Sequence, residues 1–237
     1  MAGILEAVRG EGRSLLVVAD SAEARAVCDG VGVGARELKP WRLETLNSRV
    51  DLLLTGVGKA NAAGAAARSL DPDRHSAVLS LGVAGALPGS QLCVCDVVVA
   101  TESVFADEGV ATDAGFSDIA SMGFPIAPGA GCAIPASVDL IDALAARAAA
   151  LGPIATVSTC SGTDDLARAI VTRTGALAEA MEGAAVGLAT ARVGASRGRT
   201  IRFAEVRVIS NATGDRARQG WDMPAALDRL GALTRAL

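Results

Sequence analysis

The stretch Leu177-Ala178-Glu179-Ala180-Met181-Glu182-Gly183-Ala184-Ala185-Val186 combines two patterns within ten residues. It begins with alternating apolar positions, which predict a strand, and changes at Gly183 into a run of small residues, which predicts a buried helix. Glu182 falls at the junction, where α/β enzymes often place groups that bind ligands. An acid at this place would also complement the dipole of the helix. The rest of the chain must decide between these two interpretations.

The remainder of the chain alternates strand-like and helix-like segments. Apolar runs that predict buried strands occur at 14–19, 51–55, 77–81, 96–104, 154–159 and 202–210. Helices are predicted after Asp20 or Ser21, in the Ala-rich run after Lys59, from Val138 to Leu151 with Ser137 as cap, after Cys160-Ser161-Gly162-Thr163, and from Met223 to Leu237. This alternation predicts an α/β sandwich. The 237 residues contain no Pro/Ser-rich linker, so we expect one domain over residues 1–237.

The composition favours a soluble, cytoplasmic protein. Hydrophobic residues make up 51% of the chain, but the apolar runs are too short to span a bilayer. Residues 1–6 lack the charged-then-apolar pattern of a signal peptide. A formal net charge of −4, without a Lys/Arg cluster, argues against a surface that binds nucleic acid or another polyanion.

The cysteines and the single histidine do not form a recognisable metal or triad pattern. Cys93 and Cys95 are spaced as C-x-C, unlike a zinc knuckle, and the five cysteines are odd in number. We expect reduced, mostly buried thiols and no metal or other cofactor. His75 follows Asp71-Pro72-Asp73-Arg74 in an apparent polar loop without a partner, which argues against a histidine-based triad.

Two further segments allow more than one interpretation. The turn Gly56-Val57-Gly58-Lys59 could receive a phosphate on its backbone amides, but it lacks the third glycine of a dinucleotide fingerprint and the G-K-[ST] ending of a P-loop. A tight strand-to-helix turn is the favoured interpretation. Residues 105–128 show little periodicity, which is typical of a functional lid or a loop that contacts a partner.

Five pieces of the chain occur together in one characteristic order. They are the N-terminal strand with Glu23, G-V-G-K-A-N-A-A, L-G-V-A-G, A-M-E-G-A-A, and I-S-N near the end. Together they resemble the nucleoside phosphorylase/nucleosidase family, over nearly the whole chain from about Leu15 to Leu237. The resemblance implies a three-layer sandwich with a mixed, twisted central sheet flanked by helices. It also implies cleavage of the N-glycosidic bond of a nucleoside and a homodimer or larger homo-oligomer.

The resemblance assigns catalytic roles to two acids, Glu182 and Glu23. Cleavage passes through a state with positive charge on the sugar and negative charge on the departing base, so it needs electrostatic support at both ends and a nucleophile. Glu182 matches the family residue that accepts hydrogen bonds from the ribose hydroxyls, and Met181 matches a residue that packs on the sugar. Glu23 matches the glutamate that positions and deprotonates water in the nucleosidase branch.

Other positions are assigned to the substrate pocket by the same resemblance. Ala84 and Gly85 are expected to line the ribose and base. Ser161, Gly162 and Thr163 are expected to touch the edge of the base, with their register left open. Residues 105–124 are expected to contact the aromatic tail on the 5′ end of the substrate and, by analogy with nucleosidase dimers, to do so in a neighbouring subunit.

At Asn211 the sequence differs from the family members that act on adenine, and this difference indicates the leaving group. Nucleosidases of this family that act on adenine carry Asp here, whereas an amide can donate to a purine nitrogen or to a 6-oxo group. Asn211 therefore favours hypoxanthine as leaving group, as in the branch of the family that hydrolyses futalosine for menaquinone synthesis. That branch also matches Ile209–Arg216 and Trp221–Ala226. Asn211 cannot protonate the base, so either its hydrogen bond suffices or Asp215 supplies the proton.

Three other functions remain as alternatives. A nucleosidase for methylthioadenosine, S-adenosylhomocysteine or aminodeoxyfutalosine would release adenine, against the indication of Asn211. A purine nucleoside phosphorylase would need cations for phosphate, and Ser80-Leu81-Gly82-Val83-Ala84-Gly85 contains no Arg. A nucleoside-binding protein without turnover would not need both Glu23 and Glu182.

Overall fold

The strand-and-helix alternation is present throughout the computed structural model, which describes residues 12–34, 36–126 and 131–235. The elements in chain order are β1 (Arg13–Val18), α2 (Ser21–Val31), β2 (Leu43–Thr45), β3 (Val50–Leu54), α3 (Lys59–Ser69), β4 (His75–Ala86), β5 (Val97–Phe105), β6 (Gly109–Thr112), β7 (Gly115–Asp118), β8 (Ala133–Pro135), α4 (Val138–Ala145), β9 (Ala150–Thr156), α5 (Asp164–Thr174), β10 (Ala178–Ala180), α6 (Gly183–Ser196), β11 (Arg202–Ala212), the 3₁₀ turn η1 (Arg216–Arg218) and α7 (Met223–Thr234).

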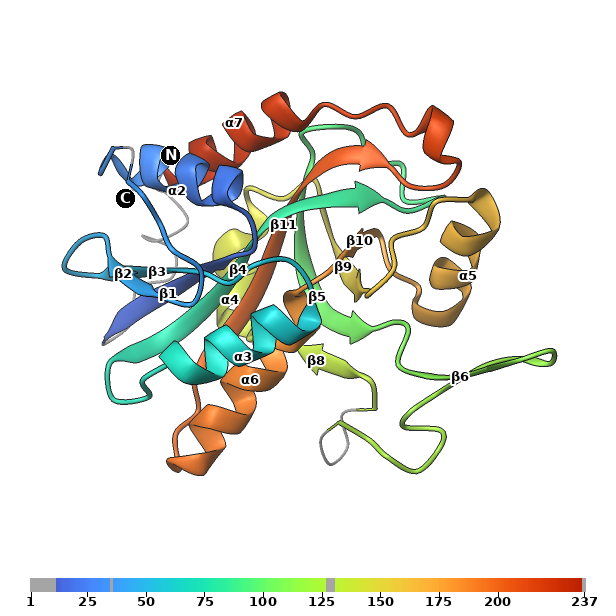
Figure 1. Cartoon of the computed structure of the whole chain (residues 1–237), viewed down its shortest axis with the longest axis horizontal. Coiled ribbons are helices and arrows are strands. Elements are labelled where there is room, and N and C mark those ends of the chain that lie inside the picture. The colour runs from blue at the N-terminus through green and yellow to red at the C-terminus, as the bar shows by residue number, and fades with distance from the viewer. Residues whose placement is uncertain (1–11, 35, 127–130, 236–237) are drawn as a thin grey trace.

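The elements form three layers, with the large sheet between two groups of helices (Figure 1). Apolar residues of α2, α4 and α7 pack in one cluster on one face of the sheet. Apolar residues of α3 and α6, mostly alanines, pack in a second cluster on the other face. Small side chains allow these helices to approach the strands closely, which explains a core with so few aromatic residues. The predicted sandwich with a mixed sheet flanked by helices is confirmed.

The sheet closes on itself at one end. Its order is β10-β9-β5-β11-β4-β1-β3-β2, and β10 pairs with β4 as well as with β9. Strands β4, β11, β5, β9 and β10 therefore form a ring, from which β1, β3 and β2 continue as an open sheet. β4 is parallel to β1 and β11, whereas β11 and β5 are antiparallel, so the sheet is mixed. The strand ends on one rim of this ring line the pocket described below.

The structure corrects several predicted boundaries. The predicted helix 138–151 ends at Ala145, because residues from Ala150 pair with β5 as strand β9. β4 continues through the glycines to Ala86, and β11 continues through Asn211 to Ala212. The closing helix ends at Thr234. Residues 127 and 128 of the predicted irregular segment, and 236 and 237 of the predicted helix, lie outside the described part of the chain, as do residues 1–6.

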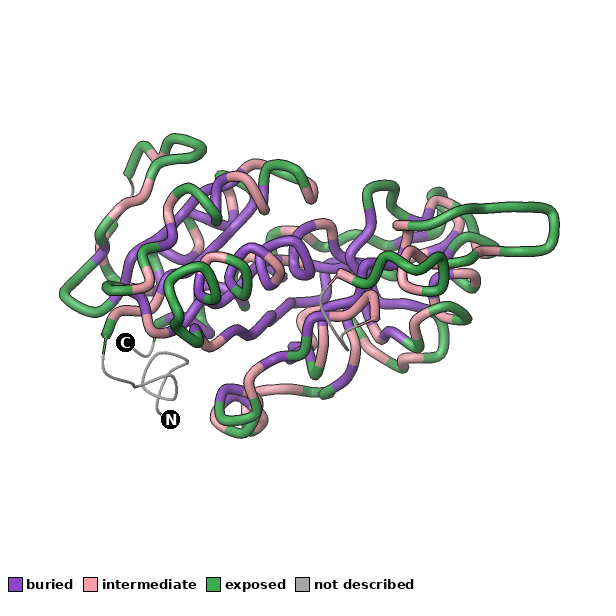
Figure 2. The backbone as a smooth tube through the Cα atoms, turned by 90° about the horizontal axis from the view of Figure 1, so that it is seen from below, coloured by how far each residue is buried: buried purple, intermediate pink, exposed green. Residues whose placement is uncertain are grey.

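The segment predicted to be irregular contains a regular hairpin. Strands β6 and β7 pair with each other but not with the large sheet. The hairpin extends from the body of the molecule, and its residues are largely exposed (Figure 2). Its short, glycine-bounded strands are too brief for a clear period-2 pattern, which is why the sequence does not reveal them.

The prediction that His75 lies in a polar loop without a partner is wrong. His75 is the first residue of β4, is 2% exposed, and accepts a hydrogen bond from the Asp71 amide on Nδ1. Its Nε2 lies 3.0 Å from Asp51 Oδ2. Asp51 also binds the guanidinium groups of Arg13 and Arg74, and these hydrogen bonds hold the pKa of Asp51 well below its ordinary value despite its burial. The group is structural, because it does not line the pocket.

The expectation of mostly buried cysteines is also wrong. All five thiols are free, but only Cys28 is buried, while Cys93 and Cys160 are exposed. Among the described residues, no group of three or more His, Cys, Asp or Glu is arranged to hold a metal ion. Within those same ranges, none of the helices combines the length and the apolar character needed to cross a bilayer.

Candidate active site

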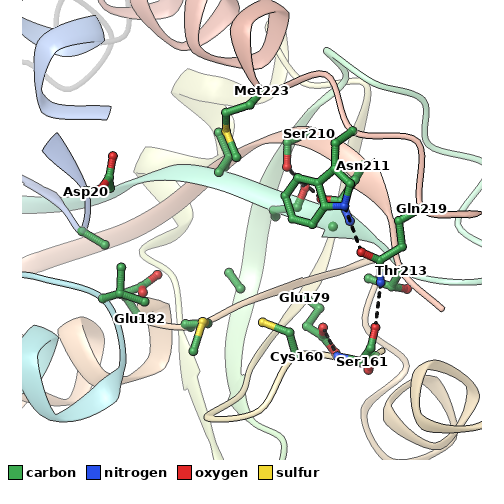
Figure 3. A pocket seen from close by; sticks show the side chains of 18 of the residues that line it. Asp20, Cys160, Ser161, Glu179, Glu182, Ser210, Asn211, Thr213, Gln219 and Met223 are labelled. Atoms are coloured by element: carbon green, nitrogen blue, oxygen red, sulfur yellow. Dashed lines mark hydrogen bonds between the residues drawn. The ribbon is translucent and has the colours of Figure 1, made fainter. Parts of the chain in front are cut away.

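A pocket of about 360 Å³ opens at the rim of the strand ring and contains most of the predicted site residues. Glu23, Ala84, Gly85, Ser161, Met181, Glu182 and Asn211 all line it. They come from the ends of β4 and β11, from the first turn of α2, and from the segments that follow β9 and β10. Figure 3 shows the side chains of Glu182 and Asn211 around the same cavity. Residues separated by more than 180 positions in the chain are thus brought to one site.

Glu23 is held by its position in the first turn of α2. Asp20 caps this helix, and the carboxylate of Glu23 reaches back to complete a capping box. Its Oε2 accepts hydrogen bonds from the amides of Ala19 and Asp20 at 3.0 and 3.1 Å, and its Oε1 accepts one from Val83 at 2.9 Å. Burial raises the pKa of Glu23, although Arg207 and the Val83 amide oppose this effect. The capping interpretation and a functional role are therefore compatible.

Arg207 is buried among three carboxylates. Its Nε donates to Glu205 Oε1 at 2.8 Å, and its NH1 lies 3.4 Å from Glu182 Oε2. The positive charge of Arg207 also acts to lower the pKa of Glu23. Its NH2 donates to the Ser80 hydroxyl at 3.1 Å. Arg207 is 1% exposed, so its charge is neutralised by the protein and not by water.

Glu205 belongs to this cluster but not to the pocket lining. It is fully buried, accepts a hydrogen bond from the Ser103 hydroxyl at 2.5 Å, and burial raises its pKa. A Cβ added to Gly183 would lie 1.9 Å from Glu205 Oε2, so only glycine can begin α6 here. The change of pattern at Gly183 therefore has a steric cause.

Sequence reasoning did not single out Arg207 or Glu205. The available signal was that two charged residues stand two positions apart in an otherwise apolar strand. Alternate residues of a strand face the same side, so the two charges had to meet on one buried face. A buried arginine beside a buried glutamate is paired by necessity.

The Gly56–Lys59 turn contributes to the site in a way that the sequence did not reveal. The Gly58 amide donates to Glu182 Oε1 at 3.0 Å, so this backbone donor serves a carboxylate of the protein. Lys59 binds Asp107 and Glu108 at 2.6 and 3.0 Å, which ties the turn to the start of the β6–β7 hairpin segment. The tight strand-to-helix turn is present, and it fixes one oxygen of Glu182.

The other end of the pocket carries neutral hydrogen-bonding groups and one further acid. Asn211 Oδ1 accepts from the Ser210 hydroxyl at 2.9 Å, and its Nδ2 donates to the Ala212 carbonyl at 2.8 Å. Glu179, which sequence reasoning did not single out, lines the pocket and accepts two hydrogen bonds from Ser161. Gln219 donates to the Ser161 carbonyl at 3.1 Å. Figure 3 shows the contacts of Ser161 with Glu179 and Gln219.

Three of the predicted site residues do not line the pocket. Asp215 caps η1 by accepting a hydrogen bond from the Ala217 amide, and it pairs with Arg218 at 2.9 Å near the surface. Thr163 caps α5 through Leu166, and the Gly162 carbonyl accepts from the Arg216 amide. Their functional roles stay predictions.

The pocket has a strongly acidic lining. Asp20, Glu23, Glu179 and Glu182 face it, whereas Arg216 is the one Lys or Arg among its described lining residues. The Arg216 guanidinium lies 5.0 Å from the ring centre of Trp221, another lining residue. Desolvation by the surrounding pocket atoms, together with the charges of Glu179 and Glu182, raises the pKa of Cys160 to about 11, so its thiol stays neutral. An acidic pocket with hydrogen-bonding groups at one end suits a polar, neutral or partly cationic ligand.

Comparison with known proteins identifies the class. Residues 14–237 match the family model described as the phosphorylase superfamily, and the chain belongs to that superfamily. The family resemblance seen in the sequence is thus confirmed.

Two relatives and one solved structure are similar to this chain over most of its length. A futalosine hydrolase of Acidothermus cellulolyticus is 37% identical over 92% of this chain and 87% of that protein. A futalosine hydrolase of Streptomyces coelicolor is 36% identical over 76% of this chain and 74% of that protein. The fold also matches the 5′-methylthioadenosine/S-adenosylhomocysteine nucleosidase of Helicobacter pylori, with a TM-score of 0.72, 21% identity and 96% coverage of both chains.

The buried charge cluster makes a prediction about stability. Replacing Arg207 by Met leaves Glu182 and Glu205 without their buried cation, so the free energy of unfolding should fall by about 3–5 kcal/mol. Arg207→Lys keeps the charge and should lose less. Arg168→Met, which breaks an exposed pair with Asp165, should change stability by about 0.5 kcal/mol or less. Urea unfolding followed by circular dichroism measures all three, and equal stability of Arg207→Met and wild type would contradict the pairing.

Proposed function

We propose that this protein hydrolyses the N-glycosidic bond of futalosine, releasing hypoxanthine and dehypoxanthine futalosine as a step of menaquinone biosynthesis. The observation that carries the proposal is that Glu23, Glu182 and Asn211 line one pocket. Glu23 provides a carboxylate to activate water, Glu182 a carboxylate to bind the sugar, and Asn211 an amide to bind the base. The futalosine hydrolases at 36 and 37% identity supply the substrate.

Glu23 acts as the general base in this proposal. Water attacks C1′ of the ribose as the bond from C1′ to the base nitrogen breaks, and the water proton passes to the carboxylate of Glu23. The electron pair of the broken bond leaves with the base. A buried carboxylate with a raised pKa is a better proton acceptor than an exposed one, because its basicity is closer to neutral pH. The three amide donors hold the carboxylate in place.

Glu182 supports the sugar. Its Oε1 is fixed by the Gly58 amide and its Oε2 faces Arg207, which leaves lone pairs for the 2′- and 3′-hydroxyls. A negative charge beside the ribose favours the positive charge that develops on the ring. Met181, which also lines the pocket, packs on the same sugar.

The distribution of cations favours water over phosphate as nucleophile. Arg207 is the cation whose charge lowers the pKa of Glu23, and it is already bound to Glu205 and Glu182. A phosphate dianion placed there would meet the charges of Glu23 and Glu182 without a free guanidinium to bind it. Phosphate recognition depends on charge-assisted pairs that this pocket does not offer next to Glu23.

Asn211 serves the departing base. Its Nδ2 has a second hydrogen beyond the one donated to Ala212, and this hydrogen is available to N7 or the 6-oxo group of hypoxanthine. Asp215 lies outside the pocket and is engaged by Arg218. Of the two routes left open by the sequence, the arrangement supports a hydrogen bond from Asn211 over proton donation by Asp215.

A substrate panel tests the reaction. Futalosine, aminodeoxyfutalosine, methylthioadenosine and inosine are each incubated with the protein, with and without phosphate, and the released bases are separated by chromatography. The expected result is hypoxanthine from futalosine at a rate that phosphate does not change. Faster release of adenine from methylthioadenosine would favour an adenine nucleosidase, and acceleration by phosphate would favour a phosphorylase. Binding without release of any base would indicate a nucleoside-binding protein.

Glu23→Gln tests the role of the base. The amide cannot accept the proton of water, so kcat on futalosine should fall by about 10²–10⁴-fold with little change in KM. In the wild type the rate should decline as pH falls through the pKa of Glu23, because protonation removes the base, and burial places this decline above the ordinary value of 4.5. The variant should lack that limb of the pH profile. An unchanged kcat would remove Glu23 from the mechanism.

We also propose that the protein is a homodimer or larger homo-oligomer in which residues 105–124 contact a second subunit. The β6–β7 hairpin is exposed, and Val110 and Met122 in this region present apolar side chains to solvent. Analytical ultracentrifugation should give at least twice the mass of 23.7 kDa. A purely monomeric protein at micromolar concentration would refute this assignment.

A further inference from the structure

Three residues on adjacent strands stand in register at the base end of the pocket. Asn211 of β11 pairs with Gly85 of β4, and Gly85 pairs on its other side with Glu179 of β10. Residues directly opposite one another in a sheet project to the same face. Asn211 and Glu179 accordingly both line the pocket, one on each side of a residue without a side chain. This juxtaposition exists only because β10 closes the strand ring.

Gly85 keeps the space between the two side chains open. A Cβ at this position would lie 2.6 Å from the Thr213 methyl group and 3.2 Å from Asn211 Nδ2. Neighbouring strands are about 4.8 Å apart, so the backbones of β11 and β10 are roughly 10 Å apart across β4. That span suits a planar purine with a hydrogen bond of about 2.9 Å at each edge. The flat glycine surface forms the floor between the two polar groups.

Glu179 is held as an acceptor aimed from one side of this space. Both hydrogen bonds with Ser161 are donated to Glu179, by the amide to Oε1 at 2.7 Å and by the hydroxyl to Oε2 at 2.6 Å. Burial raises the pKa of Glu179, and these two donors oppose that effect and fix the orientation of the carboxylate. Glu179 is 5% exposed and forms no ion pair with any described residue. The reaction described above leaves this buried acid without a task.

We propose that Glu179 determines specificity for a 6-oxopurine by accepting a hydrogen bond from its N1–H, opposite the donor Asn211. The proposal rests on the proposed function and deepens it. Hypoxanthine carries a hydrogen on N1 and an acceptor oxygen on C6, whereas adenine has a bare acceptor at N1 and a donor on C6. An ionised carboxylate can only accept, so it pairs with hypoxanthine and repels the N1 lone pair of adenine. Asn211 and Glu179 together distinguish the two bases.

The discriminating measurement is the ratio of kcat/KM for futalosine to that for aminodeoxyfutalosine, which carries adenine on the same sugar and tail. Glu179→Gln can donate as well as accept, so this ratio should fall by about 10- to 100-fold. Ser161→Ala removes one of the two bonds that orient Glu179 and should lower the ratio by a smaller factor. Glu37→Gln, the same change at an exposed residue outside the pocket, should leave it unchanged.

A binding experiment provides a second readout that needs no turnover. Calorimetry of the wild type should show hypoxanthine binding at least 10-fold more tightly than 1-methylhypoxanthine, which lacks the N1–H, or adenine. Glu179→Ala should reduce the difference between hypoxanthine and its 1-methyl form, because the space is then open and the acceptor is gone. Thermal melting of each variant checks that it is folded.

The outcomes separate this inference from the proposed function. If the wild type releases no hypoxanthine from futalosine, the proposed function fails. If it does, but Glu179→Gln keeps the wild-type ratio, or the wild type binds 1-methylhypoxanthine as tightly as hypoxanthine, the assignment of Glu179 alone is overturned.

Discussion

The pocket depends on one buried cation. Arg207 lies among Glu23, Glu182 and Glu205, which come from a helix start, a strand-to-helix junction and its own strand. A buried arginine with fewer carboxylates would be costly, and so would three buried carboxylates without the arginine. The cluster therefore couples distant segments of the chain. Apolar residues would stabilise this interior at lower cost, so the charges are best explained by the chemistry that they support.

Much of the architecture could be predicted from the sequence because the local patterns are strong. Apolar runs located β1, β3, β5 and β11, and the glycine at 183 marked the start of α6. The failures have tertiary causes. Residues 146–151 have helical composition, but pairing with β5 draws Ala150 and the residues after it into a strand. His75 looks like a loop residue until Asp51, 24 positions earlier, is brought next to it by β3 and β4.

The sequence predicted those residues of the candidate site that stand in recognisable family motifs. Glu23, Met181, Glu182 and Asn211 stand in motifs of the family, and the structure brings them to one pocket. Arg207 and Glu179 stand in buried, mostly apolar strands, where a charge can be recognised as functional only when its partner is known. Register across strands is a property of the folded sheet, and no spacing along the chain reveals that Asn211 and Glu179 share a glycine between them.

Closure of the ring by β10 has a consequence for how this enzyme class can diversify. Asn211, Gly85 and Glu179 lie on paired strands beside the pocket, so an insertion or deletion at these positions would disturb the ring. New leaving groups must instead arise through single replacements at a few facing positions, on a scaffold whose dimensions stay constant. Other lining residues, such as Ser161 and Gln219, lie in segments between helices and strands, where a change in chain length is easier to accommodate. The positions on the paired strands and those in the connecting segments can therefore change independently of one another.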